Sequence, residues 1–307
     1  MYEYGDLKYN APIVVFAFNR IDVLKKCIVS LLANKESTES ELYVFVDGPR
    51  HEKPDDNEKV NSVQEYVKTI SGFKSVHYQF AETNKGLAPS VIRGVSEIIE
   101  KYGRVIVVED DLFVSHNFLA FMNQGLNQYE DIRNVFSICG YTNIVKRPTN
   151  YDYDAYFCTR SSSWGWATWK DRWDSVDWKL ENWPAHKKNA RDFNKWGGSD
   201  CWKMLNDWHE GLNSSWAIRF CYSQFLQNCL SLFPLASKVG NNGFDGRGTH
   251  AKKWSRFKFE FDKSADIKFR FPLEYEINKS LYKEALSYHS IPIRIWSRLM
   301  YLIHRNN

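Results

Sequence analysis

Short apolar runs and amphipathic segments alternate along the first half of the chain. Predicted strands cover residues 12–18, 41–48, 75–80 and 104–108, and segments with helical spacing of apolar residues cover 21–34, 57–70 and 88–102. Runs of four to eight apolar residues indicate buried strands, and the 3.6-residue period indicates helices. Strands separated by helices of this length join through right-handed crossovers, so the pattern predicts an α/β fold with a mostly parallel sheet flanked by helices.

Polar or charged residues follow each of these four predicted strands. They are Asn19–Arg20, Asp47–Arg50, Glu82–Gly86 and Glu109–Asp111. The carboxyl ends of parallel strands meet at one edge of a sheet, and ligands of open α/β sheets bind in the crevice outside that edge. We therefore expect a binding site built from these four loops.

The second half has a different pattern. From about Tyr151 the strand signals fade, and Trp becomes dense over residues 161–183. Two helical segments (192–210 and 215–228), a short strand (230–234) and a Gly-rich stretch (240–250) follow. No internal repeat or low-complexity linker separates the halves, so we expect a shared core. Residues after about Lys252 show weak periodicity, and apart from residues 291–305 they predict no defined element.

Composition narrows the class of protein. Among 307 residues the net charge is only +4, whereas 16% of residues are aromatic, with twelve Trp. So mild a charge argues against a nucleic-acid partner, and aromatic residues suit sugar or base stacking as well as core packing. The six Cys form no CxxC pair, which fits a reducing cytoplasm.

Two features bear on location. The N-terminus lacks the pattern of a signal peptide, and no apolar run is long enough to span a membrane, so we expect a cytoplasmic protein. Residues 291–305 interleave Arg with Ile, Trp, Leu and Met. Such a helix can lie on the inner, anionic face of a membrane or dock on the protein's own core, and the sequence does not distinguish these possibilities.

Glu109, Asp110 and Asp111 stand side by side at the end of a predicted buried strand. Three like charges there repel one another and are costly to desolvate unless a cation or hydrogen-bond donors receive them. A divalent cation with oxygen ligands, Mg²⁺ or Mn²⁺, would do so. Capping of the helix predicted near residues 115–126 is the structural alternative.

The order of the motifs resembles a known family. The segments PIVVFAFNR, YVFVDG, ETNKGLAPSVIRG, VIVVEDD and SSSWGWATW are similar to the nucleotide-sugar-binding fold of the GT-A glycosyltransferases, with EDD in place of the DxD motif. The nearest likeness is to the N-acetylglucosaminyltransferase I type. SWAIRF and GFDGRGTH are similar to patterns of bacterial glycosyltransferases from polysaccharide gene clusters, and the resemblance covers about residues 11–251.

This resemblance implies a metal-dependent transfer, inverting in stereochemistry, of a sugar from a nucleotide donor, UDP above all, to a glycan or lipid-linked acceptor. The resemblance implies that Arg20 and Asp47 contact the nucleotide, and that Lys85 and Gly86 border the sugar and the diphosphate. It implies that Glu109 and Asp110 face the sugar and the ribose, and that Asp111 is the metal ligand. From the residues alone, Asp47 can equally be a turn former before Gly48, and Lys85 a solvated loop charge.

An inverting transfer also needs a base for the acceptor hydroxyl. In the related eukaryotic enzyme a WDDW segment carries it, but here the segment reads NSSWAIRF and offers no acid. The preceding helical segment contains Asp200, Asp207 and Glu210, of which we select Asp200 because Gly197 and Gly198 would permit close approach of a substrate. A helix N-cap explains Asp200 equally well.

Two further assignments concern the second half. His250 ends the Gly-rich stretch, and the resemblance implies a late His that reaches the metal or the diphosphate; a surface His after a turn is the alternative. Trp164, Trp166 and Trp169 can line an acceptor site. Trp166 and Trp169, however, have the spacing of one helical face, which predicts that at least one of them packs in the core.

The expected organisation follows. Residues 1–150 form the nucleotide-sugar-binding half of a GT-A domain, 151–255 the Trp-rich acceptor side with the base, and 256–307 a C-terminal extension that includes the basic helix. Two other functions stay open. A sugar nucleotidyltransferase would have a Gly-rich phosphate loop after the first strand, and FAFNRIDV has none. A carbohydrate-binding protein with a degenerate GT-A fold would explain the missing acid.

Overall fold

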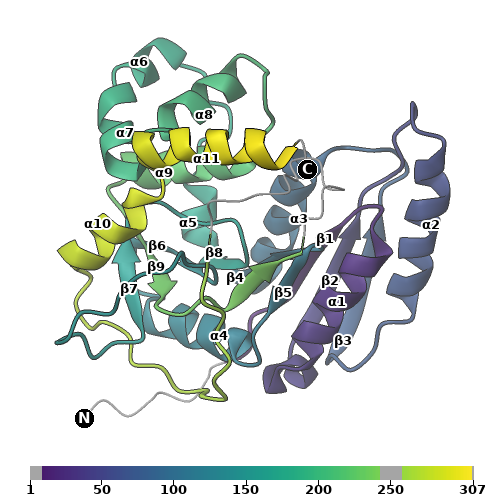
Figure 1. Cartoon of the computed structure of the whole chain (residues 1–307). Coiled ribbons are helices and arrows are strands. Elements are labelled where there is room, and N and C mark those ends of the chain that lie inside the picture. Colours follow the sequence, from purple (N-terminus) through teal and green to yellow (C-terminus); the bar gives the residue numbers. More distant parts are fainter. Residues whose placement is uncertain (1–8, 243–257, 306–307) are drawn as a thin grey trace.

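The computed structural model of the chain describes residues 9–242 and 258–305, and its centre is one mixed sheet of eight strands. The strands lie in the order β3-β2-β1-β4-β8-β6-β9-β7. Their bounds are β1 (Ile13–Ala17), β2 (Glu41–Val46), β3 (Ser75–Phe80), β4 (Arg104–Glu109), β6 (Val135–Cys139), β7 (Ala155–Cys158), β8 (Trp166–Trp169) and β9 (Leu230–Pro234). The predicted α/β class, a mostly parallel sheet flanked by helices, is confirmed (Figure 1).

The first half is built as its hydrophobic pattern predicts. β1 pairs in parallel with both β2 and β4, and β2 pairs in parallel with β3. The connecting helices are α1 (Ile21–Leu32), α2 (Asp55–Lys68) and α3 (Leu87–Tyr102). Every residue of β1 is buried, which explains its unbroken apolar sequence, because a strand covered on both faces has no polar side.

Helices cover both faces of the sheet. Val15, Val44 and Ile106 point into a core shared with α1, α2 and α4 (Phe118–Gln128). The alternate residues Val14 and Val107 point to the other face, where α3, α5 (Lys170–Asp174) and α9 (Trp216–Leu226) pack. This two-sided burial is what a strand period of two produces when helices lie on both sides.

The Trp-rich segment continues the sheet. β8 lies between β4 and β6 and is antiparallel to both, with Trp166 opposite Val107 and Cys139. Trp166 and Trp169 therefore lie on a strand, and their assignment to one helical face was wrong. Residues three apart on a strand point to opposite faces, so Trp169 packs in one core and Trp166 in the other, both almost fully buried. The two halves share one sheet.

A lobe of short helices lies above the β6–β9 part of the sheet (Figure 1). It comprises α6 (Trp183–Lys187), α7 (Ala190–Gly197), α8 (Cys201–His209) and α9. The helix predicted over 192–210 is broken between Gly197 and Asp200, where Gly198 has φ +115°. Only glycine adopts that backbone conformation readily, so the chain turns there instead of continuing as one helix.

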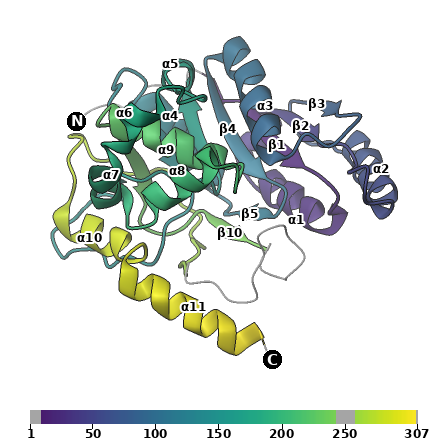
Figure 2. The same ribbon diagram turned by 90° about the horizontal axis from the view of Figure 1, so that it is seen from above.

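The C-terminal region adds α10 (Lys279–Ser287) and α11 (Ile291–Arg305). Figure 2 shows α11 along the outer side of the helical lobe, with its first turn next to α10. The basic, aromatic segment 291–305 is thus a helix, as predicted. No described helix combines the length and apolar character that crossing a bilayer requires.

Candidate functional site

The loops after β1 and β4 meet through one guanidinium group. Arg20, directly before α1, donates from one terminal nitrogen to Asp110 Oδ1 at 2.8 Å and to Asp111 Oδ2 at 3.1 Å. The backbone N–H of Phe18 also faces Asp110 Oδ2, at 3.4 Å. Because β1 and β4 are parallel neighbours, their carboxyl ends bring the cation and the acids together.

A second carboxylate joins the loops after β1 and β2. Asp56, in the first turn of α2, accepts hydrogen bonds from Asn19 Nδ2 at 2.8 Å and from Arg50 Nε at 2.5 Å and Nη2 at 3.0 Å. These hydrogen bonds, those from Arg50 most of all, lower the pKa of Asp56 to about 2 in spite of its burial. Asp56 thus fixes two of the loops that form the edge.

Asp47 holds the loop between β3 and α3. Its Oδ1 accepts from the backbone N–H groups of Gly48 and Lys85, and its Oδ2 from Gly86 N–H and from the amide of Asn84, all at 2.8 to 3.0 Å. A Cβ on Gly48 would lie 2.5 Å from the backbone of Thr83, so only glycine permits this approach. The Lys85 side chain is exposed, and the carboxylate of Asp47 is directed at the loop.

The carboxylates after β4 are held at an energetic cost. Burial, followed by the charges of Asp111 and Asp110, raises the pKa of Glu109 to about 8. Burial also raises the pKa of Asp110 to about 6, against the opposing charge of Arg20. A cluster of acids held in a poorly solvated place, with a cation on one side, is a typical feature of functional sites.

Asp111 has one carboxylate oxygen without a partner. Arg20 occupies Oδ2, whereas Oδ1 is buried and accepts no hydrogen bond. A buried, unpartnered carboxylate oxygen is the donor type that Mg²⁺ and Mn²⁺ bind, and these cations complete their shells with water and phosphate oxygens. Within residues 9–242 and 258–305 no group of three His, Cys, Asp or Glu side chains surrounds a metal position. The residues therefore fit a metal that is shared with a ligand, and do not form an all-protein cage.

A two-stranded sheet supports this end of β4. β5 (Leu112–Val114) pairs antiparallel with β10 (Val239–Asn241), and Asn242 donates its N–H to the carbonyl oxygen of Asp111 at 2.8 Å. The chain after Asn242 contains His250, which lies outside the described residues. Its assignment as a ligand stays a prediction.

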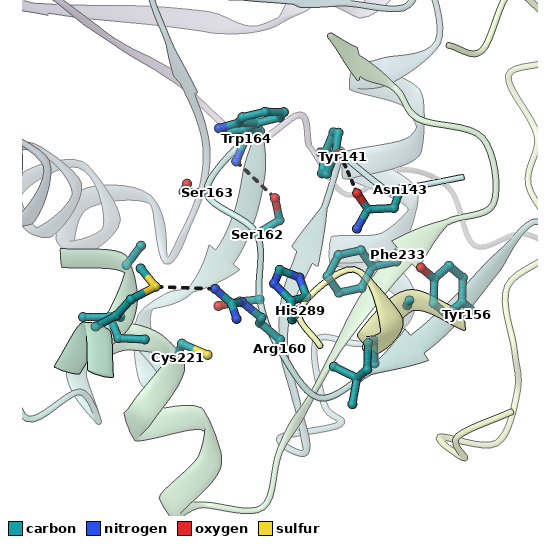
Figure 3. Close-up of a pocket in the computed structure, with 17 residues that line it drawn as sticks. Tyr141, Asn143, Tyr156, Arg160, Ser162, Ser163, Trp164, Cys221, Phe233 and His289 are labelled. Atoms are coloured by element: carbon teal, nitrogen blue, oxygen red, sulfur yellow. Dashed lines mark hydrogen bonds between the residues drawn. The ribbon is translucent and has the colours of Figure 1, made fainter. Parts of the chain in front are cut away.

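A cavity of about 230 Å³ lies between the sheet and the helical lobe (Figure 3). Its wall combines aromatic, hydroxyl, sulfur and basic side chains. Among the residues that line it are Tyr141, Tyr156, Arg160, Trp164, Ala217 and His289. Trp166 pairs with Val107 of β4, so the chain just before Trp166, including Trp164, begins at the same edge of the sheet as Glu109. One end of the cavity therefore borders the strand-end loops.

Asp200 is buried behind this cavity. Arg160 pairs with its Oδ1 at 2.7 Å, and His289 Nδ1 lies 3.8 Å from its Oδ2. Burial alone would raise the pKa of Asp200, but the charges of Arg160 and His289 outweigh burial and hold the pKa well below its usual range. An acid of such low pKa stays ionised and is a weak proton acceptor.

The strand pattern predicted that the four loops lie at one edge of the sheet, but the sequence did not point to Asp56, which joins two of these loops, or to Arg160 and His289, which line the cavity. Asp56 resembles any acid in a first helical turn, and Arg160 and His289 stand in segments with no recognisable motif. The one available signal was the Gly197–Gly198 pair, which indicates close approach of another group. The group that approaches is His289, whose Cβ would lie 2.5 Å from a Cβ on Gly198.

The sequence matches no protein-family model and no curated protein. Among solved structures, part of the fold is similar to the mannosyltransferase PcManGT from Pyrobaculum calidifontis, solved with GDP-Man and Mn²⁺, at 12% identity and a TM-score of 0.37 over 54% of this chain and 46% of that one. It is also similar to TarS of S. aureus, at 13% identity and a TM-score of 0.30 over 47% of this chain and 24% of that one. The match spans less than half of the length of PcManGT and of TarS. Function is therefore inferred from the geometry of the loops and the cavity.

Proposed function

We propose that the protein is a glycosyltransferase of GT-A type that binds a nucleotide sugar at the strand-end loops, and that the nucleotide is UDP. The observation that carries this proposal is the cluster of Arg20, Asp110 and Asp111, with the buried oxygen Asp111 Oδ1 left without a partner. Asp111 would hold a divalent cation, which would supply positive charge to the diphosphate side of the donor. When bound, it would stabilise the negative charge that develops on the leaving group.

The chain's own side chains would then divide the work. Arg20 orients Asp111 and offers a second cation close to the phosphates, and Lys85 is exposed on the loop that Asp47 fixes. Glu109 and Asp110 would be the acids that face the sugar and the ribose of the donor. Asp47 already accepts four hydrogen bonds from neighbouring residues of the protein. It would therefore bind the uracil of the donor only by exchanging one of these hydrogen bonds.

The acceptor would enter the cavity beside the donor. Its aromatic residues suit the C–H faces of a sugar, and its Ser, Asn and Arg side chains suit hydroxyl groups. A glycan or lipid-linked saccharide fits such a lining. A carbohydrate-binding protein without activity would show the same lining but would bind donor without releasing nucleoside diphosphate, which separates the two functions by experiment.

A sugar nucleotidyltransferase fits the geometry less well. Such an enzyme presents a series of backbone N–H groups to phosphates from a Gly-rich loop. The loop after β1 carries Asn19 and Arg20 in place of glycines, and their side chains are turned to Asp56 and Asp110.

Substitution of Asp111 tests the proposed function. Asp111→Asn keeps the size of the side chain but removes the charge, so we expect Mn²⁺-dependent binding of the nucleotide sugar to weaken by about 10- to 100-fold. Stability should change little, because Asp110 still pairs with Arg20. Titration calorimetry with UDP-glucose, UDP-N-acetylglucosamine and GDP-mannose measures the affinities.

Asp131→Asn is the matched control, because Asp131 is an exposed acid just before β6, at the opposite edge of the sheet. Equal affinity in the Asp111→Asn and Asp131→Asn variants would refute the metal site at Asp111.

We further propose that α11 contacts an anionic membrane surface. Ile291, Ile295, Trp296 and Leu299 are all more than half exposed and recur at helical spacing on its outer side. The helix contains no acidic residue, and Arg298 is exposed beside this row. An apolar row flanked by basic residues has the chemistry of a helix that lies in the interface of an acidic bilayer.

A further inference from the structure

The sheet ends in β3 on the side away from the helical lobe (Figure 2). Among the residues that the structure describes, β2 is the one strand that pairs with it. Natural proteins protect such an edge with Lys, Pro, a bulge or a covering segment, because unpaired backbone groups bind other chains. The β3 sequence SVHYQF contains no Lys, Asp, Glu or Pro, and its register with β2 is unbroken over six residue pairs. β3 therefore has none of the sequence features that protect an edge strand.

We propose that the outer edge of β3, the side that faces away from β2, pairs antiparallel with β3 of a second copy of the chain. A twofold axis perpendicular to the sheet would relate the two copies and pass through Tyr78. The same patch of both copies then forms the interface, as in most homodimers. This inference goes beyond the proposed function and does not depend on it, because no ligand takes part in the contact.

The backbone of β3 directs the required groups outward. Ala81 donates its N–H to the carbonyl oxygen of Val46 at 3.0 Å, so the backbone of Ala81 faces β2. The N–H and C=O groups of successive strand residues alternate between the two sides of the strand, and those of Val76, Tyr78 and Phe80 therefore face outward. In the proposed register Tyr78 lies opposite the partner's Tyr78, and Val76 opposite the partner's Phe80. Each of these pairs can exchange two backbone hydrogen bonds.

The side chains of the same three residues suit this pairing. Val76, Tyr78 and Phe80 lie on one face of the strand because they are two residues apart. Tyr78 is 47% exposed, and its ring stacks on that of Phe80 with 4.9 Å between the centroids. Pairing would bring two Tyr78 rings beside each other and Val76 against the partner's Phe80. Aromatic and β-branched pairs across antiparallel strands stabilise a sheet.

The charges beyond the two ends of β3 favour the register centred on Tyr78. Lys74 precedes the strand with its side chain 62% exposed, and Glu82, also exposed, follows the strand. In this register Lys74 lies opposite the partner's Glu82, and by symmetry the pair occurs twice. A register centred on His77 would put Lys74 opposite the partner's Phe80, which is apolar. Opposite charges that face each other across two strands stabilise the pairing, and like charges oppose it.

Sedimentation velocity of the parent, at concentrations above and below about 10 µM, tests for the dimer, because an interface this short gives an affinity in roughly the micromolar range. Tyr78→Lys would place two like charges at the twofold axis. Tyr78→Pro removes an outward N–H and leaves the hydrogen bonds to β2 in place. Val29→Lys is the control for an added Lys, since Val29 is 65% exposed and lies on α1.

We expect the parent and Val29→Lys to form dimers as the concentration rises, and both Tyr78 variants to associate at least about tenfold more weakly. Thermal unfolding checks that the variants are folded, and Tyr78→Lys keeps the test valid if Tyr78→Pro does not fold. A parent that stays monomeric at every concentration would overturn the proposal. A dimer that Tyr78→Lys leaves intact would overturn it as well, because the contact would then lie elsewhere.

Charge reversal tests the register. Lys74→Glu and Glu82→Lys each put like charges across the interface, so each variant alone should associate about tenfold more weakly than the parent. An equimolar mixture of the two variants restores opposite charges in both pairs and should form a heterodimer about as tight as the parent dimer. Lys59→Glu, on α2, controls for the change of charge. Lys74 also lies 3.7 Å from Glu41 of its own chain, so thermal unfolding checks each variant. A mixture that associates no better than the single variants would overturn pairing centred on Tyr78.

Discussion

Single side chains join the loops of the strand-end edge, each to its neighbour in the sheet. Asp47 joins the loops after β2 and β3, Asp56 those after β1 and β2, and Arg20 those after β1 and β4. The position of each loop follows from the strand pattern, because parallel strands end at one edge. The hydrogen-bond partners of these side chains do not follow from the pattern, because a hydrogen bond requires its two atoms to be placed within a few tenths of an ångström, and no local pattern encodes such positions.

Asp56 provides a test of this network through stability. Its folded pKa of about 2 lies below its ordinary value of 3.8, so between these values the unfolded chain binds more protons than the folded one. Its contribution is therefore complete above about pH 4 and is lost as the pH falls toward 2. We expect Asp56→Asn to lower the free energy of unfolding by about 1 to 2 kcal/mol at pH 6, and by less at pH 3.

Urea unfolding of the parent and the Asp56→Asn variant at pH 6 and pH 3 measures this difference. Asp55→Asn is the matched control, since the neighbouring Asp55 side chain is 87% exposed and its oxygen lies 4.0 Å from Lys59 Nζ. A deficit of the same size at both pH values would show that Asp56 acts by packing and not by charge.

At the scale of elements, the sequence predicts a strand or helix correctly where the segment's own residues show a clear pattern. It fails where contacts with residues distant in the chain determine the structure. β1, β2 and β4 were predicted because they are apolar almost throughout, and the helices between them because apolar residues recur at helical spacing. β3 was also predicted, although the structure leaves it only partly buried. β8 was missed because Trp166 and Trp169 fit a helical spacing, and only pairing with β4 and β6 makes this segment a strand. α7 and α8 were predicted as one helix because a glycine break is tolerated in a helical pattern until another residue, here His289, requires it.

The outer face of α11 carries a prediction of its own. If this face contacts a membrane, the protein should co-sediment with vesicles that contain phosphatidylglycerol and bind phosphatidylcholine vesicles at least about tenfold more weakly. The double variant Ile295→Glu, Trp296→Glu should lose this binding, because both side chains are exposed and charges there oppose insertion.

Val29→Glu controls for the introduced charge, since Val29 is equally exposed but lies on α1. Light scattering on the same samples tests the other occupant of this face. A dimer that the double variant dissociates, with no vesicle binding by the parent, would assign α11 to a contact between two copies of the chain.

On the scale of the whole molecule, one sheet unites the donor side and the acceptor side. Insertion of β8 between β4 and β6 puts Trp164 and the cavity beside the edge that ends in Glu109. The expectation of a shared core was confirmed. The position of the cavity was not predictable, because it depends on α8, α9 and a histidine that follows α10 meeting in space.

The measurement that tests the central claim most directly is thermal unfolding of the parent protein with a panel of nucleotides and nucleotide sugars, each with Mn²⁺ and with EDTA. A bound ligand at about 100 times its Kd adds about 2.7 kcal/mol of stability and raises the unfolding temperature by several degrees. We predict such a rise for a UDP compound with Mn²⁺ and its loss with EDTA. No rise with any nucleotide under either condition would contradict a donor site at Asp111.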